Sequence, residues 1–125
     1  MLPLRFPWFW STLGWLMLLG VGVGSLLPGK QLPMVFVQDK LVHAASYCLL
    51  MIWFSGLYER RRHLLIAVLL AFFGAALDGM QALTTTRTFE VPDILANVSG
   101  IAFGLLLARI LLAGWCQRVE RLLPV

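Results

Sequence analysis

Two long stretches of this chain contain no charged side chain: the residues between Arg5 and Lys30, and those between Lys40 and Glu59. A helix needs about 20 mostly apolar residues to cross the hydrocarbon core of a bilayer. Of the 125 residues, 60% are hydrophobic and 13% are charged, and the mean hydropathy is +0.85. A soluble domain of this size needs more polar residues to cover its core. The sequence therefore predicts an integral membrane protein.

Four apolar segments predict an all-α fold, a bundle of four transmembrane helices in a single domain over residues 1–125. The expected helices cover residues 8–27, 40–58, 64–83 and 93–115. Pro28 and Gly29 end the first helix, and the prolines at 28 and 33 favour a loop over residues 30–38. Asp93 is expected to be the N-cap of the fourth helix, where its charge also suits the helix dipole.

The first apolar segment has an alternative interpretation as a cleaved signal peptide. Gly22-Val23-Gly24 resembles the small-residue site at which such peptides are cut. The apolar stretch is longer than the usual signal core of about 7–15 residues. An uncleaved helix is therefore favoured.

Basic residues are distributed unequally between the two ends of the expected bundle. One end, which holds both termini and the second loop, carries Arg5, Arg60, Arg61, Arg62, Arg118 and Arg121. The opposite loops hold only Lys30, Lys40 and Arg87. The positive-inside rule then places both termini in the cytoplasm. Since the basic residues behind the net charge of +4 flank hydrophobic spans, no nucleic-acid partner is expected.

With this orientation, ten polar residues lie at the outer ends of the second, third and fourth helices or in the outer loop. This polar cluster consists of Asp39, Lys40, His43, Tyr47, Asp78, Gln81, Arg87, Glu90, Asp93 and Asn97. At about 100° per residue, its first four members share one face of the second helix. Polar groups at membrane depth normally turn inward and find partners. Two interpretations stay open: the groups only join three helix ends, or they line a pocket that binds a ligand at the outer leaflet.

The charge of the polar cluster limits its ligand. It holds two basic and four acidic residues, so its formal charge is −2 when His43 is neutral. A bare phosphate site requires the opposite sign. Either burial and like charges keep a carboxyl protonated, or a divalent cation such as Mg²⁺ or Ca²⁺ joins the carboxylates. Zinc is disfavoured, because His43 is the only nitrogen ligand in the cluster; the sequence identifies no metal and no cofactor.

Small residues indicate where helices pack closely. Gly100 and Gly104 are four apart and continue the face begun by Asp93 and Asn97. This spacing lets another helix backbone approach, and glycine-rich stretches of the first and third helices are the expected partners. A homo-oligomer that pairs through these faces is the alternative.

The polar cluster resembles the two signatures of the VanZ-like membrane protein family. The first signature corresponds to Asp39 followed by Lys40-x-x-His43-x-x-x-Tyr47. The second corresponds to Asp78-x-x-Gln81, Arg87, Glu90, Asp93, Asn97, Gly100 and Gly104. Two departures concern the geometry of the pocket: Asp78 stands where the family usually has Glu, and Thr85-Thr86 stands where a Pro-Gly turn often precedes the arginine.

The resemblance implies a multi-pass protein of the bacterial inner membrane with a role in the cell envelope. The family takes its name from a protein associated with resistance to the glycopeptide antibiotic teicoplanin. We therefore expect the polar cluster to bind a membrane lipid headgroup or a cell-wall-related ligand. Two alternatives stay open: an enzyme acting on a lipid or prenyl-phosphate with His43 and Asp78 as acid–base pair, and a small transporter or proton relay.

Overall fold

A computed structural model of the chain describes residues 2–26, 36–83, 91–112 and 114–122, and within these ranges the side chains of 2–23, 41–77, 79–80, 94–112 and 114–122. All of the regular structure in these ranges is helical, which confirms the all-α fold class. The elements are α1 (Pro7–Leu26), α2 (Phe36–Leu57), the short 3-10 turn η2 (Arg60–Arg62), α3 (His63–Leu83), α4 (Val91–Ile110) and α5 (Trp115–Leu122).

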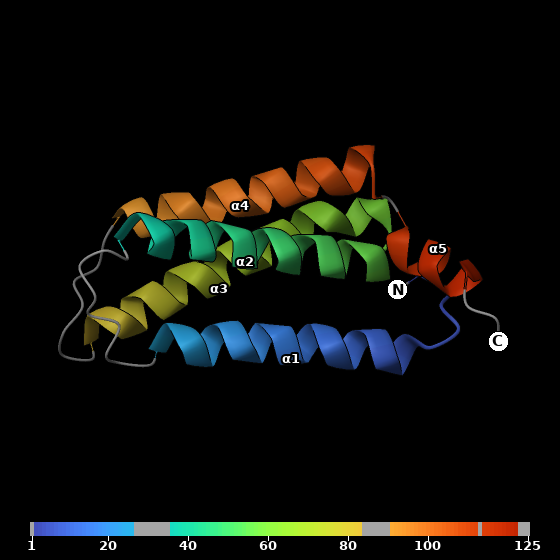
Figure 1. The fold of residues 1–125 in the computed structure, drawn as a ribbon, viewed down its shortest axis with the longest axis horizontal. Helices are drawn as coiled ribbons and strands as arrows, with labels where there is room; N and C mark the ends of the chain where they lie inside the picture. Colours follow the sequence, from blue (N-terminus) through green and yellow to red (C-terminus); the bar gives the residue numbers. More distant parts are fainter. Residues whose placement is uncertain (1, 27–35, 84–90, 113, 123–125) are drawn as a thin grey trace.

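The four long helices lie side by side and alternate in direction (Figure 1). Both ends of the described chain lie at one end of the bundle, here called the terminal end, together with η2 and α5. The opposite end, called the loop end, is where α1 and α3 finish and where α2 and α4 begin. The starts of α2 and α4 and the finish of α3 carry eight of the ten residues of the polar cluster, so the alternation of the helices brings these eight positions toward one end.

Two helix starts differ from the expected ones by more than one residue. The second helix begins at Phe36, so Gln38 belongs to α2 and not to the preceding loop. The fourth begins at Val91, which makes Asp93 its third residue and not its N-cap. An acidic residue in the first turn still suits the positive end of the helix dipole.

The fourth helix also ends earlier than expected, and a fifth helix follows it. α4 stops at Ile110, and Gly114 adopts a left-handed conformation with φ 65° that favours glycine. After this break, α5 continues at 55° to α4. The guanidinium of Arg118 donates to the Leu111 carbonyl at 2.9 Å, which satisfies one backbone acceptor just beyond the end of α4.

α2 and α4 make the most extensive contact of any two described helices. A Cβ atom at Gly100 would collide with the Ala44 carbonyl of α2, and one at Gly104 would lie 2.8 Å from the Cys48 carbonyl. The glycine pair therefore packs against α2, where the sequence had suggested the first or third helix. Only residues without a side chain allow the two backbones to approach this closely.

The bundle exposes large apolar side chains on every long helix. Trp15 of α1, Leu49 of α2, Phe72 of α3 and Phe103 of α4 are all more than half exposed. Polar side chains are found inside instead, among them Ser55, His63 and Asn97. Judged on the described residues, no single helix has both the length and the apolar character needed to cross a membrane, whereas the bent pair Ile94–Ile110 with Trp115–Leu122 meets this test by length and composition alone.

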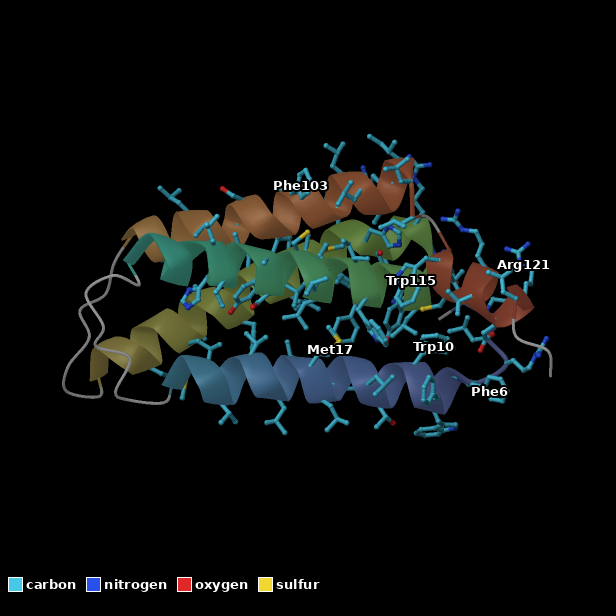
Figure 2. The ribbon with its side chains drawn as sticks, in the orientation of Figure 1. Phe6, Trp10, Met17, Phe103, Trp115 and Arg121 are labelled. Atoms are coloured by element: carbon cyan, nitrogen blue, oxygen red, sulfur yellow. The ribbon has the colours of Figure 1, made fainter. Side chains whose placement is uncertain are left out.

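Three tryptophans form an aromatic cluster at the terminal end. The rings of Trp10, Trp53 and Trp115 lie with centroids 5.0–5.7 Å apart, and Figure 2 shows Trp10 and Trp115 close together there. The Trp53 indole donates to the Trp10 carbonyl at 2.9 Å, and the Trp115 indole donates to the Ile52 carbonyl at 2.7 Å. These contacts join α1, α2 and α5, so the tryptophans fix the helices relative to one another.

Candidate functional site

Two buried polar side chains of the polar cluster meet over a glycine of the neighbouring helix. Tyr47 of α2 and Asn97 of α4 are 2% and 3% exposed. A Cβ atom built on Gly74 of α3 would lie 2.9 Å from the Asn97 Nδ2 and 3.1 Å from the Tyr47 hydroxyl. The two polar groups therefore occupy the space that a side chain at position 74 would fill. We call Tyr47, Gly74 and Asn97 the junction.

The junction contains a buried acceptor that the described residues leave unused. The Asn97 Oδ1 is buried and has no hydrogen-bond partner among the described residues. A buried polar atom in this state costs about 1–3 kcal/mol relative to a paired one. A donor supplied by a ligand, by a water or by a side chain outside the described ones would remove that cost. The junction can thus accept a hydrogen bond inside the bundle.

His43 extends the polar face of α2 from the junction toward the loop end. It lies one turn before Tyr47 and is half-buried. Imidazole, phenol and carboxamide groups all donate and accept hydrogen bonds. The described part of the cluster is therefore a hydrogen-bonding surface contributed by two helices.

The remaining members of the polar cluster continue outward from this surface. Asp39, Asp78 and Asp93 lie in α2, α3 and α4, each four residues from His43, Gly74 or Asn97 in the direction of the loop end. Four residues are about one helical turn. Lys40 and Gln81 are also helical. The side chains of these five residues lie outside the described ones, and Arg87 and Glu90 lie outside the described residues altogether, so their convergence on the junction stays a prediction.

Metal binding was an open question for the acidic members of the cluster. Among the side chains that the structure describes, no group of three or more His, Cys, Asp or Glu is placed to hold a metal ion. The carboxylates that we considered as ligands for Mg²⁺ or Ca²⁺ belong to residues whose side chains lie outside that set. The hypothesis of a cation among them stays a prediction.

Gly74 is a member of the site that the sequence analysis treated only as a packing residue. It precedes Asp78 by four positions, so both share one face of α3. That spacing was a usable signal, because a glycine beneath a polar residue leaves room for a partner from another helix. What the sequence could not give was the identity of the partners, which come from α2 and α4.

A second polar site at the terminal end was missed altogether. The Glu120 carboxylate of α5 accepts hydrogen bonds from the backbone N–H of Arg5 at 2.6 Å, from the backbone N–H of Phe6 at 2.8 Å and from the Trp10 indole at 2.9 Å. Burial by itself raises the pKa of this carboxyl, but the three hydrogen bonds and the charge of Arg5 outweigh it and lower the pKa. Glu120 is therefore ionised at neutral pH. Its negative charge lies at the start of α1, where the positive end of the helix dipole stabilises it.

His63 is also buried at the terminal end, where we expected only a basic turn. Its Nε2 lies 2.9 Å from the Ser55 carbonyl and 3.2 Å from the Tyr58 carbonyl. Both partners are acceptors, so Nε2 carries the proton and donates. His63 therefore satisfies carbonyl groups near the end of α2 that lack partners within the helix.

Comparisons of the chain with protein-family models, with curated proteins and with solved structures gave no match.

Proposed function

We propose that this chain is a VanZ-like integral membrane protein whose polar cluster binds the headgroup of a membrane lipid or a related cell-envelope ligand. The observation that carries the proposal is the buried junction, where the Asn97 Oδ1 has no hydrogen-bond partner among the described residues. A ligand that brings a hydrogen-bond donor would satisfy this acceptor and remove the cost of its burial. The junction is built from three separate helices, so it is a property of the folded bundle.

The distribution of apolar side chains supports a membrane location. Large apolar residues are exposed on α1, α2, α3 and α4, while the buried set includes Tyr47, Ser55, His63 and Asn97. Exposed apolar surface on this scale marks contact with a partner or with lipid. Lipid tails accept an apolar exterior without penalty, and polar side chains then pair between helices. The positive-inside rule further supports an orientation with both termini in the cytoplasm and the polar cluster facing outward.

Each part of the polar cluster has a role in this proposal. Lys40 and Arg87 hold anionic groups of the ligand. The hydrogen-bonding members are His43, Tyr47, Gln81 and Asn97. The carboxylates of Asp39, Asp78, Glu90 and Asp93 orient the ligand or hold a cation that offsets the negative charge of the cluster. The ligand is thus a polar headgroup that offers both donors and an anionic group.

Native mass spectrometry of the protein purified from bacterial membranes tests the proposal. We expect wild type to retain a lipid that Asn97→Ala and Arg87→Ala lose, because the first removes a buried hydrogen-bonding group and the second a cation. Ser99→Ala is the matched control on α4, since Ser99 is exposed and lies two residues from Asn97. Equal lipid retention in wild type and in both cluster variants would overturn the proposal.

A further inference from the structure

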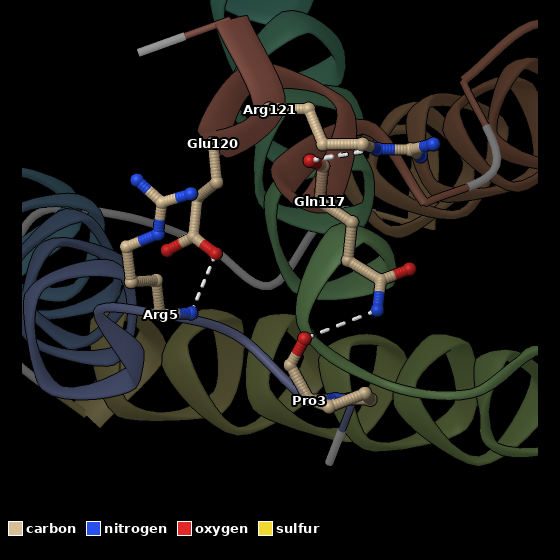
Figure 3. A pocket seen from close by; sticks show the side chains of 5 residues that line it. All are labelled: Pro3, Arg5, Gln117, Glu120 and Arg121. Atoms are coloured by element: carbon tan, nitrogen blue, oxygen red, sulfur yellow. Dashed lines mark hydrogen bonds between the residues drawn. The ribbon is translucent and has the colours of Figure 1, made fainter. Parts of the chain in front are cut away.

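A pocket of about 470 Å³ lies at the terminal end, between the N-terminal segment and α5. It is lined by Pro3, Arg5, Gln117, Glu120 and Arg121 (Figure 3). It shares no residue with the polar cluster and lies at the opposite end of the bundle. A ligand bound here would therefore be distinct from the one proposed for the cluster.

Hydrogen bonds hold both walls of this pocket in place. The Gln117 side-chain amide donates to the Pro3 carbonyl at 3.1 Å, and the Glu120 carboxylate accepts the Arg5 backbone N–H at 2.6 Å. These two bonds fix the segment that precedes α1 to α5, and each of them joins residues more than 110 positions apart in the sequence. Neither bond uses the Arg5 guanidinium, so both can remain when the Arg5 side chain is replaced.

The charge balance of the pocket favours an anion. Arg5 and Arg121 contribute two positive charges. In Figure 3 the Arg5 guanidinium lies beside the Glu120 side chain, and the Arg121 Nε donates to the Gln117 carbonyl at 3.4 Å. Glu120 contributes the one negative charge of the lining. Its carboxylate already accepts three N–H donors, so its charge is partly neutralised by groups of the protein. The lining keeps an excess of one positive charge.

The surroundings of the pocket are those of a membrane–water interface. α5 turns Cys116 and Glu120 toward the bundle, while Arg118 and Leu122 are exposed. Trp8, which is 84% exposed, lies near the start of α1 at the same end. Aromatic and basic residues gather at the headgroup level of membranes, and an amphipathic helix with a basic face binds anionic lipid surfaces.

We propose that this pocket binds the phosphate of an anionic membrane phospholipid, with Arg5 and Arg121 as its ligating cations. Guanidinium groups match phosphate oxygens with paired N–H donors. Trp8 and Leu122 are exposed apolar side chains at the same end, and burying them against acyl chains would favour a lipid as the occupant. The proposal rests on the membrane location argued above but not on the ligand of the polar cluster.

Lipid binding to the detergent-solubilised full chain tests this proposal, with phosphatidylglycerol and phosphatidylcholine titrated separately in native mass spectrometry. Wild type should prefer phosphatidylglycerol. The double variant Arg5→Ala/Arg121→Ala should lose that preference, with affinity reduced about tenfold or more. The control Arg61→Ala/Arg62→Ala removes the same charge from the exposed η2 turn and should change the affinity less than about twofold. Ser99→Ala, an exposed substitution on α4 outside both sites, should bind phosphatidylglycerol normally.

Three results would overturn the proposal. The first is an unchanged phosphatidylglycerol affinity in the Arg5/Arg121 double variant. The second is an equal loss in the Arg61/Arg62 control, which would show a diffuse charge effect. The third is complete displacement of the lipid by millimolar inorganic phosphate, which would make free phosphate the ligand. If the double variant does not fold by circular dichroism, Arg121→Ala alone provides the measurement, because Arg121 is exposed.

Discussion

The two ends of the bundle treat their buried polar groups differently. At the terminal end, Glu120 accepts three hydrogen bonds, and the indoles of Trp10, Trp53 and Trp115 each donate one. At the loop end, the Asn97 Oδ1 is buried with no partner among the described residues. Satisfied polar networks fix a structure, whereas an unused buried acceptor reduces stability. The hydrogen bonds at the terminal end therefore fix the helices there, whereas the loop end leaves a buried acceptor unused, and the ligand proposed for the polar cluster depends on this difference.

The terminal end also contains one buried atom without a hydrogen-bond partner among the described residues. His63 donates through Nε2, but its Nδ1 is buried without a hydrogen-bond partner among the described residues. In the neutral ring this nitrogen bears no proton and is only an acceptor. The difference between the ends therefore lies in how many buried groups are paired, and it can be measured by substitution.

The largest expected effect concerns the close contact between α2 and α4, which run through the whole bundle. Gly100→Ala places a methyl group against the Ala44 carbonyl, which belongs to backbone and has little freedom to move. α2 and α4 must separate, and the free energy of unfolding should fall by about 3 kcal/mol or more. Chemical denaturation in detergent measures the change.

Gly20→Ala is the matched control for this substitution. No atom lies within 4 Å of a Cβ built at Gly20, so the variant should be neutral or more stable by up to about 1 kcal/mol, owing to the better helix propensity of alanine. If Gly100→Ala is as stable as Gly20→Ala, the close contact between α2 and α4 does not exist as described.

A smaller effect is expected at the terminal end from Glu120→Gln. The amide replaces one carboxylate oxygen with a donor that faces N–H groups, so stability at neutral pH should fall by about 1–3 kcal/mol. The pKa of Glu120 is lowered below its usual 4.5 in the folded state. Its contribution is therefore complete above pH 4.5 and is lost as the pH falls through the lowered pKa.

Denaturation measured from pH 7 down to pH 3 checks both the size and the sign of this effect. Wild type should lose stability through the acid range, and Glu120→Gln should lose less of it. Glu59→Gln is the control, because Glu59 forms an ion pair with the exposed Arg61 at 2.7 Å, and such surface pairs contribute about 0–1 kcal/mol. If the stability of wild type and Glu120→Gln depends on pH in the same way, this carboxylate does not stabilise the fold.

These contacts also show which features could be predicted from the sequence. The apolar stretches indicated the four long helices. The expectation that polar groups of the cluster turn inward agrees with the burial of Tyr47 and Asn97. The contacts of Glu120 with Arg5 and Phe6 join residues about 115 positions apart, which no local spacing reveals. α5 was missed because its charged residues lie beyond the apolar stretch that predicted the fourth helix, although one face of it packs on the bundle.

The tryptophans illustrate the same limit. Taken one at a time, Trp10, Trp53 and Trp115 are typical of residues at a membrane interface. In the structure they contact one another from three different helices. The preference of a residue for a depth can be predicted from its chemistry, but its partners depend on how the helices are arranged. The same reason explains why Gly100 was assigned the wrong neighbouring helix.

The smallest expected effect is the most informative, because the two ends should respond with opposite signs. Asn97→Leu replaces a buried amide by an apolar group of similar size and removes the Oδ1, which has no partner within the described part of the chain. If the loop end is built for binding, stability should stay the same or rise by up to about 1 kcal/mol, while retention of the native lipid falls. Denaturation and native mass spectrometry on the same preparation measure the two quantities. A loss of stability comparable to that of Glu120→Gln would mean that the amide is paired in the folded protein, and the functional contrast between the two ends would then disappear.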